Sequence, residues 1–165
     1  MKVAPPNRVA RSYVQKLVAG PSAVFPLLCP VREADWIEGW DPVAVWSDSG
    51  VAEADCVFVT AAPAGSPQDA VWYVTRHEPE SGFVEMLKIT PEVTACRLTI
   101  QLRAVSEGAG EGAGTEATVT YMHTSLGPAG DDFVAAFTEE HYRQFMQDWE
   151  ARMNHYLRTG EALQS

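Results

Sequence analysis

Four residues that can hold or transfer a proton fall on segments with the alternating pattern of β-strands. They are Arg76, Glu85, Tyr121 and His123. Histidine titrates near neutral pH, and an apolar environment raises the pKa of a carboxyl group, so His123 and Glu85 have the chemistry of general acids and bases. The same groups also form local hydrogen bonds in packed interiors. The sequence leaves both roles open.

The histidines do not form a metal-binding pattern. His141 and His155 share one expected helix, but 14 residues at ~1.5 Å each separate them by roughly 21 Å. His77 and His123 could meet only if the strand register differs from the one derived below. No GxGxxG, GxxxxGK[ST], GxSxG or HExxH motif occurs. We therefore expect no metal and no cofactor.

Aromatic and methionine side chains suit the binding of a small molecule, which needs an apolar cavity and a few polar anchors. The candidate ligand-binding residues are Trp36, Trp40, Phe58, Trp72, Arg76, Glu85, Leu98, Tyr121, His123, Tyr142, Met146 and Trp149. An ordinary hydrophobic core contains the same residue types. The aromatic residues alone therefore do not predict a cavity.

The segment CPVREADWIEGW, residues 29–40, carries two tryptophans four residues apart. Pro30 suits the first turn of a short helix, and Gly39 would end it. Trp36 and Trp40 then lie one helical turn apart and can pack on the same side. We expect this segment to form a lid or wall over one end of the sheet.

The three cysteines, Cys29, Cys56 and Cys96, follow no CxxC or Cys/His spacing. Their odd number and wide spacing argue against disulfides and zinc. We expect buried, reduced thiols.

The elements that must position these residues follow from hydrophobic periodicity. Residues 8–19 predict a long first strand, and residues 23–28 predict a short helix with Ser22 as its N-cap. Six later runs separated by turn residues predict strands at 43–46, 56–60, 71–77, 83–89, 95–104 and 117–125. The glycine-rich SEGAGEGAG, residues 106–114, is interpreted as a mobile hairpin tip between two strands.

The C-terminal part changes to a helical period. A short lead-in piece and a main helix starting near Thr138 are expected within residues 131–157, and Gly160 would end the helix. Its apolar stripe consists of Tyr142, Phe145, Met146, Trp149, Met153, Tyr156 and Leu157. The chain thus predicts one α+β domain over residues 1–165. It comprises a seven-stranded antiparallel sheet, two short helices between the first and second strands, and a long C-terminal helix on one sheet face.

The turn lengths predict which side chains face the helix. A two-residue turn at Pro91 and Glu92 pairs Leu87 with Cys96, Glu85 with Leu98 and Phe83 with Ile100. Because the second strand has its apolar face at the even-numbered residues from Cys96 to Leu102, Glu85 points inward in this register.

A four-residue PESG loop fixes the preceding hairpin. It pairs Arg76 with Glu85, Val74 with Leu87 and Trp72 with Ile89, which predicts an inward Arg76–Glu85 ion pair. A one-residue change in loop length would instead place Tyr73, Thr75 and His77 inside.

The formal net charge is −10, and residues 33–75 contain eight acids and no Lys or Arg. Such a surface argues against nucleic acid and against anionic membranes as partners, and it favours a neutral or cationic ligand. No stretch is apolar enough to span a bilayer, and no secretory signal is visible, so a cytoplasmic protein is expected. A homodimer remains possible.

This order of elements resembles the START-like or polyketide cyclase superfamily (SRPBCC), whose helix-grip fold curls an antiparallel sheet around a C-terminal helix. A closer resemblance, to a bacterial subgroup of that superfamily, rests on VFPLLCPVREADWIEGW, GVAEADCVFVT, WYVTRHEP, VTYMHTSLGPAG and EEHYRQFMQDWEARMNHYLRTG. The resemblance implies a cavity between sheet and helix for a lipid, polyketide or aromatic molecule. Some members are cyclases or dehydratases, and others only bind or carry, so the fold does not decide the activity.

Three functional hypotheses follow. The first is binding or carrying of a small hydrophobic molecule in that cavity. The second is a cyclase- or dehydratase-type enzyme that uses His123, Tyr121 and Glu85 as acid–base groups. The third is a protein-interaction module.

Overall fold

The computed structural model describes residue 1 and residues 3–62, 68–106 and 114–164. Within these residues, seven strands form one antiparallel sheet in the order β1-β7-β6-β5-β4-β3-β2. Strands β2 to β7 follow one another as a meander, and β1 lies beside β7. The predicted turn PAGSP and most of the predicted glycine-rich hairpin tip lie outside the described residues.

The elements agree with the predicted fold class. They are β1 (Arg8–Leu17), α1 (Pro21–Val24), η1 (Phe25–Leu27), η2 (Arg32–Asp35), β2 (Ala44–Trp46), β3 (Val57–Thr60), β4 (Ala70–Glu78), β5 (Phe83–Thr90), β6 (Thr94–Val105), β7 (Gly114–Ser125), α2 (Pro128–Ala136) and α3 (Glu139–Thr159). The two short helical pieces are partly 3₁₀, and Gly20 rather than Ser22 caps the first.

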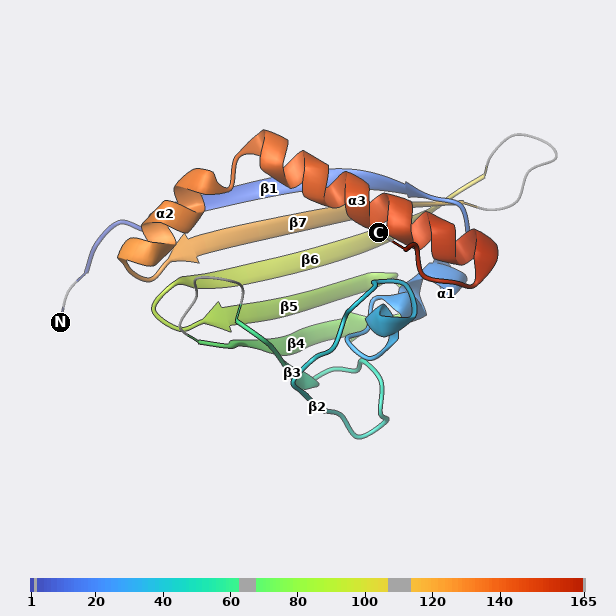
Figure 1. Cartoon of the computed structure of the whole chain (residues 1–165), viewed down its shortest axis with the longest axis horizontal. Helices are drawn as coiled ribbons and strands as arrows, with labels where there is room; N and C mark the ends of the chain where they lie inside the picture. Colours follow the sequence, from blue (N-terminus) through green and yellow to red (C-terminus); the bar gives the residue numbers. More distant parts are fainter. Residues whose placement is uncertain (2, 63–67, 107–113, 165) are drawn as a thin grey trace.

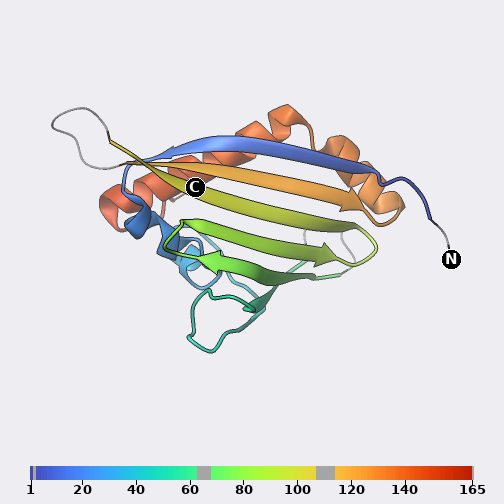
Figure 2. The same ribbon diagram turned by 180° about the vertical axis from the view of Figure 1, so that it is seen from behind.

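Helices α2 and α3 cover one face of the sheet, as Figure 1 shows. The view from behind shows the other face without any helix over it (Figure 2). We call the covered side the inner face and the other the outer face. The short helices between β1 and β2 close the end of the inner face near the C-terminal end of α3 (Figure 1).

Helix α3 begins and ends as the sequence predicts. The hydroxyl of Thr138 accepts a hydrogen bond from the backbone N–H of His141 (3.1 Å), and Gly160 ends the helix with φ +75°. The helix is tied to β1 by Asn154, whose side chain accepts from the Val18 N–H (2.9 Å) and donates to the Lys16 carbonyl (2.8 Å). The helix is therefore held along the sheet by directional bonds as well as by its apolar stripe.

The predicted register of the β5–β6 hairpin is wrong by one residue. The turn contains three residues rather than two, because Thr90 pairs with Thr94 and Glu92 takes a left-handed conformation with φ +62°. Three-residue hairpin loops require such a residue. Leu87, Glu85 and Phe83 therefore pair with Arg97, Thr99 and Gln101 instead of Cys96, Leu98 and Ile100.

A one-residue shift moves every β5 side chain to the other face. Val84 and Met86 are buried on the inner face, whereas Leu87 is 38% exposed. The predicted inward orientation of Glu85 is therefore wrong, and Lys88 takes an inner position instead, opposite Cys96.

The β4–β5 hairpin is partly as predicted. Arg76 pairs with Glu85 across the PESG loop, but an irregularity between Val74 and Arg76 shifts the remaining pairs, so Val74 faces Met86 and Trp72 faces Lys88. The predicted pairs Val74–Leu87 and Trp72–Ile89 are wrong for this reason. A bulge of this kind inserts one extra residue and changes which side chains point inward beyond it.

The bulge also bears on the alternative register of β4, in which Tyr73, Thr75 and His77 would all face inward. Tyr73 is 42% exposed, whereas Trp72 and Val74 are buried. Beyond the bulge, the His77 ring lies 4.9 Å from the ring of buried Phe25, centroid to centroid. Of the three, His77 is the one that packs against the helical side.

Candidate ligand-binding cavity

A cavity of about 510 Å³ lies between the inner face of the sheet and the helices. Its wall is formed by Leu28, Glu33, Ile37, Trp40, Phe58, Thr60, Ala61, Trp72, Met86, Lys88, Leu98, Ile100, Tyr121, His123, Phe133, Phe137, His141, Phe145, Asp148, Trp149 and Arg152. The volume falls in the range of pockets that hold small molecules, roughly 300 to 1,000 Å³. Most of the wall is apolar or aromatic.

The sheet supplies the floor of the cavity. Phe58 on β3 and Trp72 on β4 stack with ring centroids 5.2 Å apart, and the Trp72 indole N–H donates to the Thr60 hydroxyl (3.0 Å). Met86 and Leu98 continue the floor as a directly paired couple on β5 and β6. Because the indole is fixed by both contacts, this side of the cavity is preformed.

Helix α3 supplies the opposite wall. Phe145 packs edge-on against Tyr121 of β7 at 5.9 Å, and Trp149 packs edge-on against Trp36 at 5.2 Å. Met146, on the other side of the helix stripe, is completely buried. Phe145 keeps 39% of its surface exposed, so its ring borders the cavity rather than the packed core.

Lys88 brings a cation into this apolar space. Its ammonium lies over the Trp72 ring, 4.9 Å from the centroid. Burial lowers its pKa, because the charged form loses hydration. The ion pairs of the described residues do not include Lys88. The Trp72 ring is thus the cation–π partner of this ammonium.

His123 is the second polar group at this end of the cavity. Its side chain is 4% exposed and lies between the rings of Phe133 (4.7 Å) and Phe137 (4.6 Å) of α2 and its C-cap. Burial, and next the charge of Lys88, lowers its pKa to about 4, so the ring is neutral at pH 7. Among the buried side-chain atoms of the described residues, its Nδ1 alone lacks a hydrogen-bond partner.

Cys96 lies between these two residues on the sheet. It pairs with Lys88 on one side and with His123 on the other. Burial raises the pKa of its thiol to about 12, so it is protonated and unreactive at neutral pH. All three cysteines are free and buried, as expected from the sequence.

Glu33 lies at the opposite end, on the short helix η2. It lines the cavity, and part of its side chain stays accessible because it faces the hollow rather than packed atoms. Burial raises the pKa of its carboxyl to about 8. Near neutral pH it is therefore largely protonated and can donate a hydrogen bond.

The segment around Glu33 forms a wall of the cavity. The indole N–H of Trp36 donates to the Leu27 carbonyl (3.2 Å), and that of Trp40 donates to the Pro30 carbonyl (2.7 Å). Trp36 is completely buried behind the wall, whereas Trp40 lines the cavity. The two tryptophans therefore hold this segment closed on itself and position Glu33.

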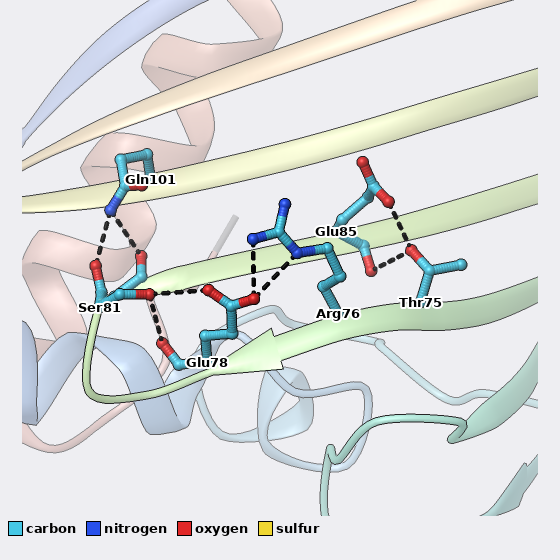
Figure 3. Close-up of polar contacts among 7 residues, drawn as sticks. Thr75, Arg76, Glu78, Ser81, Glu85 and Gln101 are labelled. Carbon is cyan, nitrogen blue, oxygen red and sulfur yellow. Dashed lines mark hydrogen bonds and ion pairs between the residues drawn. The ribbon is translucent and has the colours of Figure 1, made fainter.

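Arg76 and Glu85 are not among the residues that line the cavity, and Figure 3 shows the polar contacts that they make instead. Arg76 forms an ion pair with Glu78 (2.8 Å), and Glu85 accepts a hydrogen bond from the Thr75 hydroxyl (2.8 Å). Both residues lie on the outer face. Their predicted role as inward polar anchors is therefore wrong, although their cross-strand pairing is confirmed.

The other predicted site residues divide into two groups. Those that line the cavity are Trp40, Phe58, Trp72, Leu98, Tyr121, His123 and Trp149. Those buried in the core behind it are Trp36, Tyr142 and Met146. Sequence reasoning missed Glu33, Lys88 and the α2 side chains Phe133 and Phe137.

The described residues contain no group of three or more His, Cys, Asp or Glu side chains placed to hold a metal ion. In the same residues, none of the helices has the length and apolarity that crossing a membrane requires. The polar side chains that line the cavity are Glu33, Thr60, Lys88, Tyr121, His123, His141, Asp148 and Arg152. These can hold a ligand's polar ends or move protons.

Comparison with solved structures agrees with this architecture. Norcoclaurine synthase from Thalictrum flavum superimposes with a TM-score of 0.65 at 12% identity, covering 93% of this chain and 97% of that one. Ara h 8.0201 gives 0.59 at 13% identity, covering 91% and 97%. The di-domain ARO/CYC BexL of the BE-7585A biosynthetic pathway gives 0.62 at 13% identity, covering 91% of this chain and 46% of that one.

No protein-family model and no curated protein matches the sequence. At these identities the structural likeness establishes the fold. The chain has the helix-grip fold that these solved structures share, which confirms the predicted fold class.

Proposed function

We propose that this protein binds a small, largely apolar molecule in the cavity between the sheet and α3. The observation that carries the proposal is the size and lining of that cavity, about 510 Å³ walled mostly by apolar and aromatic side chains. Proteins of the same fold include norcoclaurine synthase, one of whose structures is a complex with dopamine and hydroxybenzaldehyde. The fold thus accommodates aromatic molecules of this size in that relative.

The apolar lining of the hollow supports the proposal. Phe58, Trp72 and Leu98 leave apolar surface open to it, and an apolar molecule that covers such surface gains about 25 cal/mol per Å².

Two measurements test binding. Native mass spectrometry of the purified protein, followed by extraction under denaturing conditions, should release a copurified apolar compound. The neutral dye Nile red should gain fluorescence on addition to the protein. Leu98→Phe, which fills the cavity floor, should weaken dye binding about 5-fold or more, as expected when roughly 1 kcal/mol of contact is lost.

Leu87→Phe is the matched control, since Leu87 lies on the outer face. It should leave dye binding unchanged, and circular dichroism should show both variants folded. An empty protein that takes up no dye, or equal binding by both variants, contradicts the proposal.

Glu33 favours a second candidate function, acid–base catalysis. A carboxyl whose pKa is about 8 can both donate and accept a proton near neutral pH, and this one lines the cavity. Glu33, and not Glu85 on the outer face, is therefore the candidate acid–base carboxyl group. Tyr121 is close enough for the Glu33 charge to raise the pKa of its phenol further, after burial and Cys96.

Proton exchange at a ketone tests this candidate. With 2-tetralone in D₂O, wild-type protein should speed deuterium incorporation next to the carbonyl, and Glu33→Gln should abolish the acceleration. Glu85→Gln should leave it intact. If the ketone binds and exchanges only at the uncatalysed rate, the enzyme candidate is lost and binding remains.

A further inference from the structure

We propose that the ligand is an organic monocarboxylate whose charged end is held by Lys88 and His123 in the cavity. This inference rests on the proposed function and names the chemical class of its ligand. It replaces the neutral or cationic ligand suggested by the acidic loops, because the group that faces the bound molecule is Lys88 and not those loops.

The sheet places the two groups at a fixed separation. Lys88, Cys96 and His123 are direct cross-strand neighbours on β5, β6 and β7. Adjacent strands lie about 4.8 Å apart, so the Cα atoms of Lys88 and His123 are roughly 10 Å apart. Lys88 and His123 both line the cavity, whereas Cys96 between them is buried and does not, so a carboxylate inside the cavity can meet both side chains.

The charges that face the cavity leave one cation without a counter-ion. Asp148 and Arg152 of α3 form an ion pair at 2.8 Å and neutralise each other. Glu33 is largely protonated near neutral pH, and the Cys96 thiol is protonated. His141 of α3 also lines the wall and adds no negative charge. An anion that enters this space therefore meets Lys88 as the uncompensated charge among the described residues.

His123 supplies the second observation. It is more than nine-tenths buried, lines the cavity, and has a ring nitrogen without a hydrogen-bond partner in the described residues. A neutral imidazole can donate one N–H to a carboxylate oxygen, while the Lys88 ammonium donates to the other. The Nδ1 without a partner is enclosed by protein atoms, so the contact with the ligand falls to the part of the ring that lines the cavity.

The rest of the cavity defines the rest of the ligand. From Lys88 the wall continues through Met86, Leu98 and Ile100 toward Ile37 and Trp40 at the lid. These residues offer apolar contact, and a second anionic group there would lack a cation. The ligand is therefore a single carboxylate on an apolar, flat or elongated body, and the Glu33 carboxyl can meet a neutral hydrogen-bond acceptor at its far end.

A matched ligand pair tests the inference. We would titrate the protein with 2-naphthylacetic acid and with 2-naphthaleneethanol, which share the apolar body, and follow displacement of Nile red at pH 7. Wild-type protein should bind the acid about 10-fold more tightly than the alcohol, the effect of one charge-assisted contact. Lys88→Met should remove this preference, so that the acid binds no more tightly than the alcohol.

His123→Phe should reduce the preference for the acid over the alcohol several-fold, because it removes the N–H but keeps an aromatic ring. Arg76→Met on the outer face is the control and should not change this preference. In wild-type protein, the acid should also raise the pKa of His123 above its value of about 4, seen as a shifted titration of its ring protons by NMR. This last measurement needs no variant.

The outcomes separate the two proposals. Equal affinity for acid and alcohol, or a preference that survives in Lys88→Met, overturns the carboxylate inference while Nile red binding still supports an apolar cavity. If neither naphthalene compound nor the dye binds, both proposals fail. A His123 titration that the acid does not move also contradicts the inference.

Discussion

The two faces of the β4–β5 hairpin carry charged residues of the same kinds in opposite circumstances. On the outer face Arg76 is paired with Glu78, and Glu85 accepts a hydrogen bond from Thr75 (Figure 3). On the inner face Lys88 has no carboxylate partner in the described residues, and its direct cross-strand neighbours are Trp72 and the protonated thiol of Cys96.

The difference teaches which charges to regard as functional. Exposed ion pairs contribute little to stability and can be exchanged freely. A buried charge without a partner costs stability and persists only where it is used. The sequence predicts Arg76 and Glu85 as the charged pair of the cavity, whereas in the structure Lys88 is the charged residue of this hairpin that a ligand would meet.

The largest effect should come from apolar side chains on the two faces. Met86→Ala removes a buried inner side chain and should lower the free energy of unfolding by about 2 to 4 kcal/mol. Leu87→Ala, one residue further along β5 and 38% exposed, should cost less than about 1 kcal/mol. Urea denaturation of both variants measures the contrast. Similar losses would mean that both faces of β5 are buried in solution.

The carboxyl groups of the two regions should respond oppositely to pH. The folded pKa of Glu33, about 8, lies above its usual value of 4.5. Its proton is retained in the folded state, so stability falls as pH rises from about 4.5 to 8. Glu33→Gln should remove this loss and stabilise the protein by about 1 to 3 kcal/mol at pH 8, less than the full shift implies because the cavity can hold water.

Glu78 on the outer face gives the comparison. Arg76, and next Ser81, lowers its pKa, so its contribution is present above the usual carboxyl pKa and is lost as the pH falls through the lowered value. Glu78→Gln should therefore flatten the acid side of the stability profile and leave the alkaline side unchanged. Thermal unfolding from pH 3 to 9 measures both variants. If the stability of Glu33→Gln still falls as the pH rises toward 8, a group other than Glu33 causes the loss.

The smallest effect should come from Glu85. Glu85→Gln keeps an acceptor for the Thr75 hydroxyl, so the free energy of unfolding should change by less than about 1 kcal/mol. Nile red binding should not change. A clear loss of dye binding in this variant would show that the outer face is coupled to the cavity.

The sequence predicts the elements well because their signals are local. The alternation from Cys96 to Leu102 places the inner face of β6, and Tyr121 and His123 are buried on β7 as expected. Thr138 and Gly160 mark the ends of α3. These inferences need only periodicity and capping, which are read from neighbouring residues.

The orientation of β5 could not be read in this way. Phe83, Leu87 and Ile89 make one face apolar, and Val84 and Met86 make the other apolar, so the strand's own pattern does not decide between them. The length of the turn decides which face points inward, and the turn requires Glu92 in a left-handed conformation. Glycine or asparagine at this position would have indicated such a turn, whereas glutamate does not. Lys88 was missed because a lysine is expected to face solvent.

The predicted site was incomplete at both ends for similar reasons. Glu33 sits in a segment rich in acids, and no local pattern separates the carboxyl that lines the cavity from those that face solvent. Phe133 and Phe137 reach His123 because α2 docks on the β5–β6 turn, where a Cβ on Gly130 would lie 1.9 Å from the Val93 carbonyl oxygen. The sequence pattern of neither segment indicates such a contact, because the two segments are far apart in the chain.

The three-residue turn between β5 and β6 also has a consequence for how this cavity can change over generations. Its length sets which side chains of β5 face inward, and the two faces of that strand carry opposite charges, Lys88 on one and Glu85 on the other. Deleting one residue from this turn would exchange the two faces. A descendant protein could thus reverse the charge that its ligand meets through one deletion in this turn, without any substitution in β5.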